Sequence, residues 1–268
     1  MNHLINFVLS SKLFISLSVF SLALATQYTL GVYNFKILLL LFFGTFLSYN
    51  FQRFIFCYTV KKDLKSFWIL KNKYVFQFLL LISVIIFSNL FLKLSGITQL
   101  MVLMISTISL SYPISRKTPY LKIFLIAFSW SFSTVALIYY ESNLTLNPNV
   151  VLSIISRMFF IIAITIPFDI RDVEYDKKKT YTIPMLVGDK MAKKIAVFFL
   201  LLFLIIDSYL YLNNLNFGFF ISTILCFLYS FYFVSKDNQK KDGLYYSFWL
   251  ESCSISLLFF LIITSIFL

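Results

Sequence analysis

The sequence predicts an all-α integral membrane protein: a bundle of about nine transmembrane helices with a cytoplasmic N-terminus. Of its 268 residues, 60% are hydrophobic and only 13% are charged, which is not typical of a soluble domain. Apolar windows of roughly 20 residues, enough to cross about 30 Å of hydrocarbon, follow one another along the whole chain. The basic residues fall on alternate connections between these windows, as the positive-inside rule requires.

Nine windows are predicted as spans, and no Pro/Gly/Ser-rich linker separates them, so residues 1–268 are expected to form a single transmembrane domain. The windows are 13–33, 35–57, 74–93, 97–113, 119–140, 149–169, 191–212, 216–234 and 244–267. The stretches 13–57 and 74–113 can be divided differently, which leaves eight or ten spans as alternatives. The stretch from Leu13 is too long for a signal peptide, so we expect the first span to stay in the protein.

The charge distribution predicts the orientation of the bundle. Of the 23 Lys and Arg residues, only Lys36, Lys93 and Arg157 lie outside the N-terminal segment and the four even-to-odd connections. These connections are therefore expected on the cytoplasmic side of a cell membrane, which we take to be a bacterial inner membrane, and the C-terminus on the outer side. A net charge of +12 then indicates contact with anionic membrane lipids, and no nucleic-acid partner is expected.

The end of the sixth predicted span holds four of the chain's eleven acidic residues within eight positions. If the helix continues for two turns beyond Pro167, Asp169, Asp172 and Asp176 share one face and Glu174 points elsewhere. Three carboxylates on one face repel one another unless a cation neutralises them, and oxygen ligands alone favour a hard ion such as Mg²⁺. Because Mg²⁺ in proteins commonly binds substrate phosphates as well, the pattern predicts a phosphate or diphosphate ligand.

The same residues also suit a solvated acidic turn that Arg171 and the lysines at 177–179 balance, in a loop that has to be polar. The location favours the metal interpretation, because the cluster lies at the predicted cytoplasmic mouth of a helix bundle. There, a chain dissolved in the membrane could bring a polar head group.

Two sequence patterns around this cluster carry a family resemblance. The stretch Asp169-Ile-Arg-Asp172-Val-Glu174-Tyr-Asp176 is followed by Lys177-Lys178-Lys179, Thr182-Ile183-Pro184 and Gly188. After the fourth span, the sequence reads Tyr112-Pro113-Ile114-Ser115-Arg116-Lys117. The first resembles the second acidic motif of the UbiA-type intramembrane prenyltransferases, and the second resembles that family's Tyr-Pro-x-x-(Lys/Arg) turn. Nine spans with cytoplasmic catalytic loops also agree with the family's fold.

The family's first acidic motif, Asn-Asp-x-x-Asp-x-x-x-Asp, is expected at the end of the second span. The sequence there is Asn50-Phe51-Gln52-Arg53-Phe54-Ile55-Phe56-Cys57-Tyr58, in which only Asn50 matches. Arg53 places a cation where an acid-bound metal would lie. Two outcomes are open: one Mg²⁺ held by the second cluster with Arg53 on the diphosphate, or a bundle that binds lipid without turnover.

The resemblance implies Mg²⁺-dependent transfer of a prenyl group, inside the membrane, from a polyprenyl diphosphate to an acceptor, usually an aromatic quinone precursor. It implies that Asp169, Asp172 and Asp176 are the catalytic residues and bind the Mg²⁺. Cationic and polar side chains would stabilise the departing diphosphate. The residues expected to bind it are Asn50, Arg53, Tyr112, Arg116 and Lys117.

Two other classes of function compete with this one. The first is a membrane protein of the same fold that binds isoprenoid lipid without turnover, which the missing first motif favours. The second is a small-molecule transporter, in which Gly or Pro more often interrupts helices at the bilayer centre. Here Pro113, Pro119, Pro167 and Pro184 lie at predicted cytoplasmic ends or loops.

Three charged residues, Arg157, Asp207 and Glu251, lie inside the predicted spans, where a charge is costly. We place Asp207 near the outer interface and offer a pair between Arg157 and Glu251 as a structural hypothesis. The single histidine, His3, lies in the N-terminal segment, so histidine acid–base catalysis within the bundle is not expected.

Overall fold

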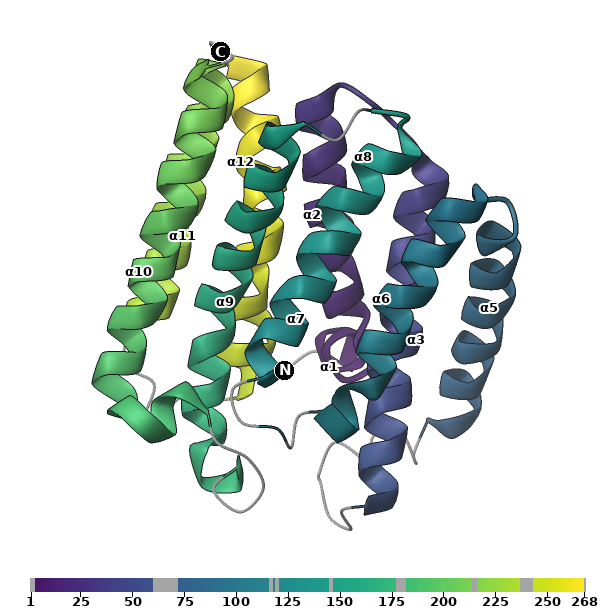
Figure 1. Ribbon diagram of the computed structural model, residues 1–268. Coiled ribbons are helices and arrows are strands. Elements are labelled where there is room, and N and C mark those ends of the chain that lie inside the picture. The colour runs from purple at the N-terminus through teal and green to yellow at the C-terminus, as the bar shows by residue number, and fades with distance from the viewer. Residues whose placement is uncertain are drawn as a thin grey trace.

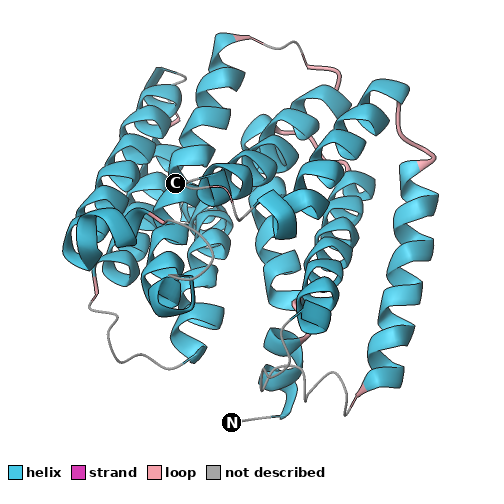
Figure 2. Cartoon of the chain, turned by 60° about the horizontal axis from the view of Figure 1, so that its bottom comes forward, coloured by secondary structure: helices cyan, strands magenta, loops and turns pink. Residues whose placement is uncertain are grey.

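The chain folds into helices, and the part of it that the structure describes contains no strand (Figures 1 and 2). The structure is a computed structural model that describes the backbone of residues 3–59, 72–115, 118, 121–144, 147–176, 182–213, 216–236 and 243–267. The helices are α1 (His3–Ser10), α2 (Leu13–Leu30), α3 (Phe35–Thr59), α5 (Lys73–Phe91), α6 (Gly96–Ser115), α7 (Leu121–Ser131), α8 (Leu137–Glu141), α9 (Pro148–Asp176), α10 (Ile183–Asn213), α11 (Phe217–Ser235) and α12 (Glu251–Phe267). Two π-helical turns, η1 (Phe132–Ala136) and η2 (Tyr245–Leu250), join α7 to α8 and precede α12.

Eight described segments are long and apolar enough to cross a membrane, counting α7 to α8 and η2 to α12 as one segment each. The apolar stretch Gly96–Ser111 of α6 is shorter, yet α6 packs between α3 and α7 along the bundle (Figure 1). These nine segments correspond to the nine predicted windows. The two ends of the chain lie at opposite ends of the bundle in Figure 1, as an odd number of crossings requires.

The long helices form a closed ring around the bundle axis. Going round it, α2 packs on α3, α3 on α6, α6 on α7, α7 on α9, then α10, α11 and α12, and α12 returns to α2. Helix α5 packs on α3 outside this ring (Figure 1) and buries only Phe76 and Ser83. The ring leaves two packed interiors, one on each side of α2 and α7.

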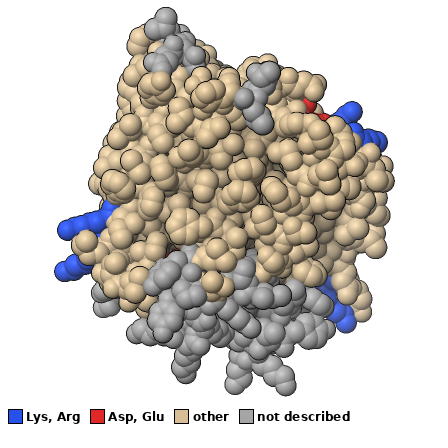
Figure 3. All heavy atoms as spheres, in the orientation of Figure 1, with Lys and Arg blue, Asp and Glu red and all other residues tan. Residues whose placement is uncertain are grey.

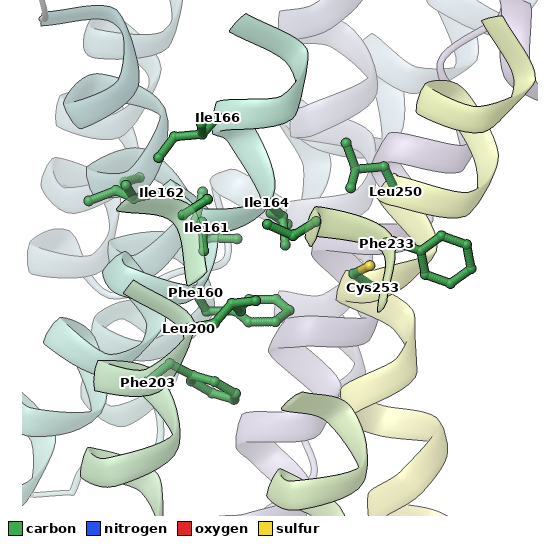
Figure 4. Packing of buried hydrophobic residues seen from close by; sticks show 14 of the residues in the cluster. Phe160, Ile161, Ile162, Ile164, Ile166, Leu200, Phe203, Phe233, Leu250 and Cys253 are labelled. Carbon is green, nitrogen blue, oxygen red and sulfur yellow. The ribbon is translucent and has the colours of Figure 1, made fainter. Parts of the chain in front are cut away.

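The larger interior joins α9, α10, α11 and α12. Figure 4 shows its buried side chains, among them Phe160 of α9 and Phe203 of α10, whose ring centroids are 4.9 Å apart. Cys226 and Cys253 are buried there without a disulfide, as small apolar residues. Since lipid exerts no hydrophobic force between helices, such close van der Waals packing is what holds them together in a bilayer.

The outer surface matches a lipid environment. Large apolar side chains such as Phe78, Leu81 and Ile85 of α5 are exposed. On the face seen in Figure 3, the charged side chains lie near the margins and a broad belt between them carries none. The protein is therefore a multi-pass membrane protein.

Candidate active site at the polar end of the bundle

The acidic cluster lies on the last turns of α9. As the sequence analysis assumed, α9 continues through Pro167 to Asp176. Pro167 has no N–H to donate, so the backbone hydrogen bond to the preceding turn is missing two residues before Asp169. The helical spacing places Asp169 and Asp172 on one face, with Asp176 next along it. The side chains of Glu174 and Asp176 lie outside the described residues.

Asp169 is neutralised by a lysine from another helix. The Nζ of Lys122, the second residue of α7, donates to Oδ1 of Asp169 at 2.6 Å. Both residues are buried, with 8% and 2% of their surfaces exposed. Burial of an ion pair has a large desolvation cost unless its geometry is good. Once it is buried, removal of either charge leaves the other without a partner, which strongly lowers stability. In the sequence, Lys122 is one of the basic residues of the second even-to-odd connection, whose role was expected to be topology; in the structure it contacts the acidic face of α9.

Asp172 has a different partner, its neighbour Arg171. The guanidinium binds the carboxylate with two bonds, from Nε to Oδ1 at 2.7 Å and from Nη2 to Oδ2 at 2.9 Å. Both side chains are about one-third exposed. Arg171 also lies over the rings of Phe168 and Tyr246, at 5.3 and 4.7 Å from their centroids. The aromatic faces hold the cation, so that the π-helical turn η2 helps position Asp172.

The pattern Thr-Ile-Pro-x-x-x-Gly begins α10. Thr182 precedes the helix, and its carbonyl accepts the backbone N–H of Met185 at 3.1 Å. Gly188 has φ 75° and ψ 162°, a conformation that breaks the helical course of α10. A side chain at this φ would be strained, which explains why a glycine stands at the end of the pattern.

Asn50 and Arg53, on α3, contact the end of α1. The Asn50 amide donates to the carbonyls of Ser11 at 3.0 Å and Phe46 at 2.8 Å. Arg53 donates from Nη1 to the carbonyl of Ser10 at 2.5 Å. The carbonyls of Ser10 and Ser11 lie at the α1 C-terminus, where donors and positive charge are favourable, whereas that of Phe46 belongs to α3 itself. The expected roles of both residues on a diphosphate stay predictions, and for Asn50 the structure leaves an acceptor oxygen rather than a donor.

A cavity of about 640 Å³ lies beside Asn50, among α3, α5, α6 and α7. Its described lining is apolar, with aromatic rings and a few uncharged polar groups. The polar members are Thr45, Ser48, Tyr49, Asn50, Ser106, Ser109, Ser129, Trp130 and Ser133. Such a volume and composition are typical of sites for drug-sized or lipid-like ligands.

A smaller cavity of about 80 Å³ lies next to the first, among α3, α6 and α7. The two share Tyr49, Ser109, Ser129 and Trp130, and the small one is also lined by Leu125 and Ile126, one turn beyond Lys122. The Trp130 Nε1 donates to the Tyr49 hydroxyl at 3.2 Å at the boundary between them. The small cavity therefore extends the large one along α7.

The fit of Mg²⁺ depends on which carboxylates are considered. Among the described residues, no three His, Cys, Asp or Glu side chains converge as metal ligands. The carboxylate of Asp169 is bound by Lys122 in the interior. The carboxylate of Asp172 is partly exposed, and a metal ion could bind it by replacing Arg171 as its partner. Since Mg²⁺ commonly takes one or two carboxylates together with substrate phosphates, Asp172 fits this ion in donor type and access.

The other predicted site residues are outside the described part of the chain. Arg116 and Lys117 are not described. The backbone of Tyr112 belongs to α6, but its side chain is not described. Sequence reasoning missed Lys122, and it also missed Tyr49 and Trp130. The position of Lys122, as the second residue of an apolar helix, was the available signal for this residue, because lysine rarely enters a span without a partner. No sequence signal identified the pair of aromatic residues.

Arg157 pairs differently from the structural hypothesis. It is 9% exposed, donates from Nη2 to Thr26 Oγ1 at 3.4 Å, and interacts electrostatically with Asp207 of α10, not with Glu251. Asp207 is also buried and accepts a hydrogen bond from Ser156. The expected pair with Glu251 is wrong, because Arg157 interacts electrostatically with Asp207 and Glu251 with Arg171.

Comparison with known proteins identifies related sequences and structures. A family model described as the UbiA prenyltransferase family matches residues 69–252, a range that excludes Asn50 and Arg53. No protein of curated function matches the sequence.

Three solved structures share the fold. The first, of a digeranylgeranylglyceryl phosphate synthase, is 18% identical, covers 100% of both chains and has a TM-score of 0.60. The second, of a UbiA homologue from Archaeoglobus fulgidus bound to DMAPP and Mg²⁺, is 14% identical over 98% of this chain and 100% of that one, with a TM-score of 0.63. The third, an apo UbiA homologue from Aeropyrum pernix K1, is 13% identical over 93% and 97%, with a TM-score of 0.62.

Proposed function

The chain belongs to the UbiA prenyltransferase family, and from this premise we propose that it transfers a prenyl group from a polyprenyl diphosphate to a small aromatic acceptor, a quinone precursor, within the membrane. The observation that carries the proposal is the acidic face of α9, with its own cations Lys122 and Arg171, at the polar end of a bundle that contains an apolar cavity. The polar end suits a diphosphate, and the cavity suits hydrocarbon and aromatic rings.

The reaction breaks the bond between the first prenyl carbon and the diphosphate oxygen. The diphosphate leaves with the electron pair, the prenyl carbon bonds to the acceptor, and the acceptor loses a proton. The barrier is lowered by groups that stabilise the charge developing on the leaving diphosphate. Arg53, Arg116 and Lys117 are the proposed cations for it, with Tyr112 donating a hydrogen bond.

We assign Asp172 and Asp176 as the ligands of Mg²⁺, which would supply positive charge to the leaving diphosphate. The role of Asp169 changes from the sequence-based assignment, because its carboxylate already binds Lys122. We propose that Asp169 holds Lys122 at the acidic face of α9, where the ammonium N–H groups are kept in position near the diphosphate. Asn50 is not proposed as a donor to the diphosphate, since both of its amide hydrogens bind backbone carbonyls.

The cavity supports the other half of the chemistry. A prenyl cation survives only where water is excluded, and electron-rich rings stabilise it. Tyr49 and Trp130 lie at the junction of the two cavities, between the cationic end and the apolar interior. We propose that they face the reacting carbon. In this proposal the polar end of the bundle lies on the cytoplasmic side of a cell membrane, where its basic loops contact anionic lipids.

A second function has one specific observation in its favour. The second span ends without carboxylates, and Asp169 is already neutralised within the chain. A protein of this fold that binds isoprenoid lipid without turnover would need no more than the cavity. The experiment below separates the two functions.

The test uses purified protein in nanodiscs with radiolabelled geranylgeranyl diphosphate, Mg²⁺ and a panel of aromatic acceptors. We expect a labelled, hexane-extractable product from the wild type and a loss of at least about 100-fold in rate with Asp172→Asn. Glu141→Gln is the matched control, because this acid lies at the other end of the bundle and its hydrogen bond from Thr98 is retained. Diphosphate binding without product, unchanged by Asp172→Asn, would instead support the binder.

A further inference from the structure

We propose that the large cavity binds the acceptor, that the buried part of this acceptor is uncharged, and that one of its O–H or N–H groups donates a hydrogen bond to Oδ1 of Asn50. The identification of this ligand as the acceptor substrate rests on the proposed function. The ligand chemistry itself, a neutral hydrogen-bond donor on a lipid-like body, is read from the cavity.

The first step is the unsatisfied oxygen of Asn50. The residue is 3% exposed and lines the cavity. Both amide hydrogens bind carbonyls, of Ser11 and Phe46, whereas Oδ1 is buried and has no hydrogen-bond partner. A buried acceptor without a donor costs about 1–3 kcal/mol, and buried side-chain oxygens are rarely left in that state. A ligand that supplies a donor recovers this free energy.

The second step excludes the prenyl donor as that ligand. A prenyl diphosphate offers phosphate oxygens, which accept hydrogen bonds, and a hydrocarbon chain, which neither donates nor accepts. Placed against Asn50 Oδ1, a phosphate oxygen would meet another acceptor. In a two-substrate transfer the hydrogen-bond donor therefore belongs to the other substrate.

The third step excludes a metal ion at Asn50. Amide oxygens can bind hard cations, but in proteins such cations also require carboxylates or phosphates for charge balance. The described residues that line the cavity include no Asp or Glu. The nearest described acids in the site, Asp169 and Asp172, have Lys122 and Arg171 as partners and do not line this cavity.

The fourth step concerns the charge of the acceptor. The described lining has no Lys, Arg or His, and its polar groups are hydroxyls, an indole and one amide. A carboxylate buried there would have no cationic partner among the described lining residues, which is strongly unfavourable. The cavity therefore selects a phenol or similar neutral amphiphile and rejects an aromatic acid, and its volume of about 640 Å³ accommodates a ring with an alkyl tail.

The experiment compares three matched ligands in the absence of any diphosphate: para-decylphenol, its methyl ether para-decylanisole, and para-decylbenzoate. They share ring and tail but differ in donor and charge. Binding to the full-length protein in nanodiscs is followed by the fluorescence of Trp130, which lines the cavity, with Trp68 and Trp249 replaced by phenylalanine. We expect the phenol to bind about tenfold or more tightly than the ether and than the benzoate.

The variant Asn50→Leu tests the assignment to this residue. It should reduce the preference for phenol over ether to less than about twofold, because the acceptor oxygen is gone. Thr107→Ala, which removes an exposed hydroxyl of α6 outside the cavity lining, is the control and should keep the preference. If Asn50→Leu does not fold, the three-ligand comparison on the wild type still decides. Equal binding of phenol and ether, or of phenol and benzoate, to the wild type overturns the proposal.

The outcome is distinguishable from that of the transfer assay. Preference for the phenol without any labelled product leaves this inference standing and removes the proposed catalysis. Labelled product with equal binding of phenol and ether supports the transferase and overturns the assignment of Asn50.

Discussion

Lys122 and Asp169, 47 positions apart in the chain, form a buried ion pair in which Nζ and Oδ1 are 2.6 Å apart. The pair ties the first turn of α7 to the last turns of α9. It fixes the position of an ammonium at the acidic face of α9. It also means that one carboxylate of the second acidic motif is compensated by the protein itself.

The first prediction concerns the stability of this pair. Lys122→Met should lower the free energy of unfolding by about 3–5 kcal/mol, because it leaves a buried carboxylate without its cation. The double variant Lys122→Met/Asp169→Leu should recover most of that loss. Thermal unfolding in detergent measures both, and Lys36→Met, at an exposed lysine, is the control. An additive double variant would show that the two charges do not depend on each other.

The second prediction concerns the metal ligands. Asp172→Asn should weaken Mn²⁺ binding, measured by electron paramagnetic resonance with a thiolodiphosphate analogue present, by about tenfold or more, since a ligand carboxylate is lost. Asp169→Asn should change it less than about threefold, because Lys122 occupies that carboxylate. Equal losses in the two variants would place Asp169 among the ligands and contradict the reassignment.

How far the sequence predicts this architecture is seen best in α9. The length of its apolar run was predicted, and the shared face of Asp169 and Asp172 was predicted on the condition that the helix continues beyond Pro167, which it does. The partner of Asp169 was not predicted, because a contact across 47 residues depends on which helices become neighbours. Lys122 looked like another anchor at the end of a span. In the same way, nothing local indicated that the Asn50 amide would donate to the carbonyl of Ser11 after α1.

The third prediction concerns Arg157, whose charge pairs with that of Asp207 inside the bundle. Arg157→Leu should destabilise the protein strongly, and Arg157→Leu/Asp207→Leu should be less destabilised than the sum of the single variants by about 0.5–3 kcal/mol. Unfolding in detergent gives the coupling. Arg157→Leu/Glu251→Leu is the matched pair that should be additive, because Glu251 interacts with Arg171. Coupling to Glu251 alone would reverse this assignment.

The fourth prediction concerns the wall of the cavity. A Cβ at Gly44 of α3 would lie 2.9 Å from the ring of Phe87 on α5, and both residues line the cavity. Gly44→Ala should therefore displace α5 and cost about 1–3 kcal/mol of stability. It should also weaken binding of para-decylphenol. Gly96→Ala has open space and should be neutral. A Gly44→Ala protein with unchanged stability and binding would show that Phe87 turns aside without cost.

The fifth prediction is the topology, which decides whether α6 counts as a full crossing. Its apolar stretch Gly96–Ser111 is shorter than the other eight segments, but with it the chain crosses nine times and its ends lie on opposite sides.

Green fluorescent protein folds to its fluorescent form in the cytoplasm but not after export through the general secretion pathway. A fusion at the N-terminus should therefore fluoresce, and one after Leu268 should not, whereas alkaline phosphatase should be active only at the C-terminus. Because eight crossings would place both ends on one side, fluorescence of both fusions would remove α6 from the spans. A dark N-terminal fusion with a fluorescent C-terminal one would invert the bundle and place Lys122 and Asp169 on the outer face.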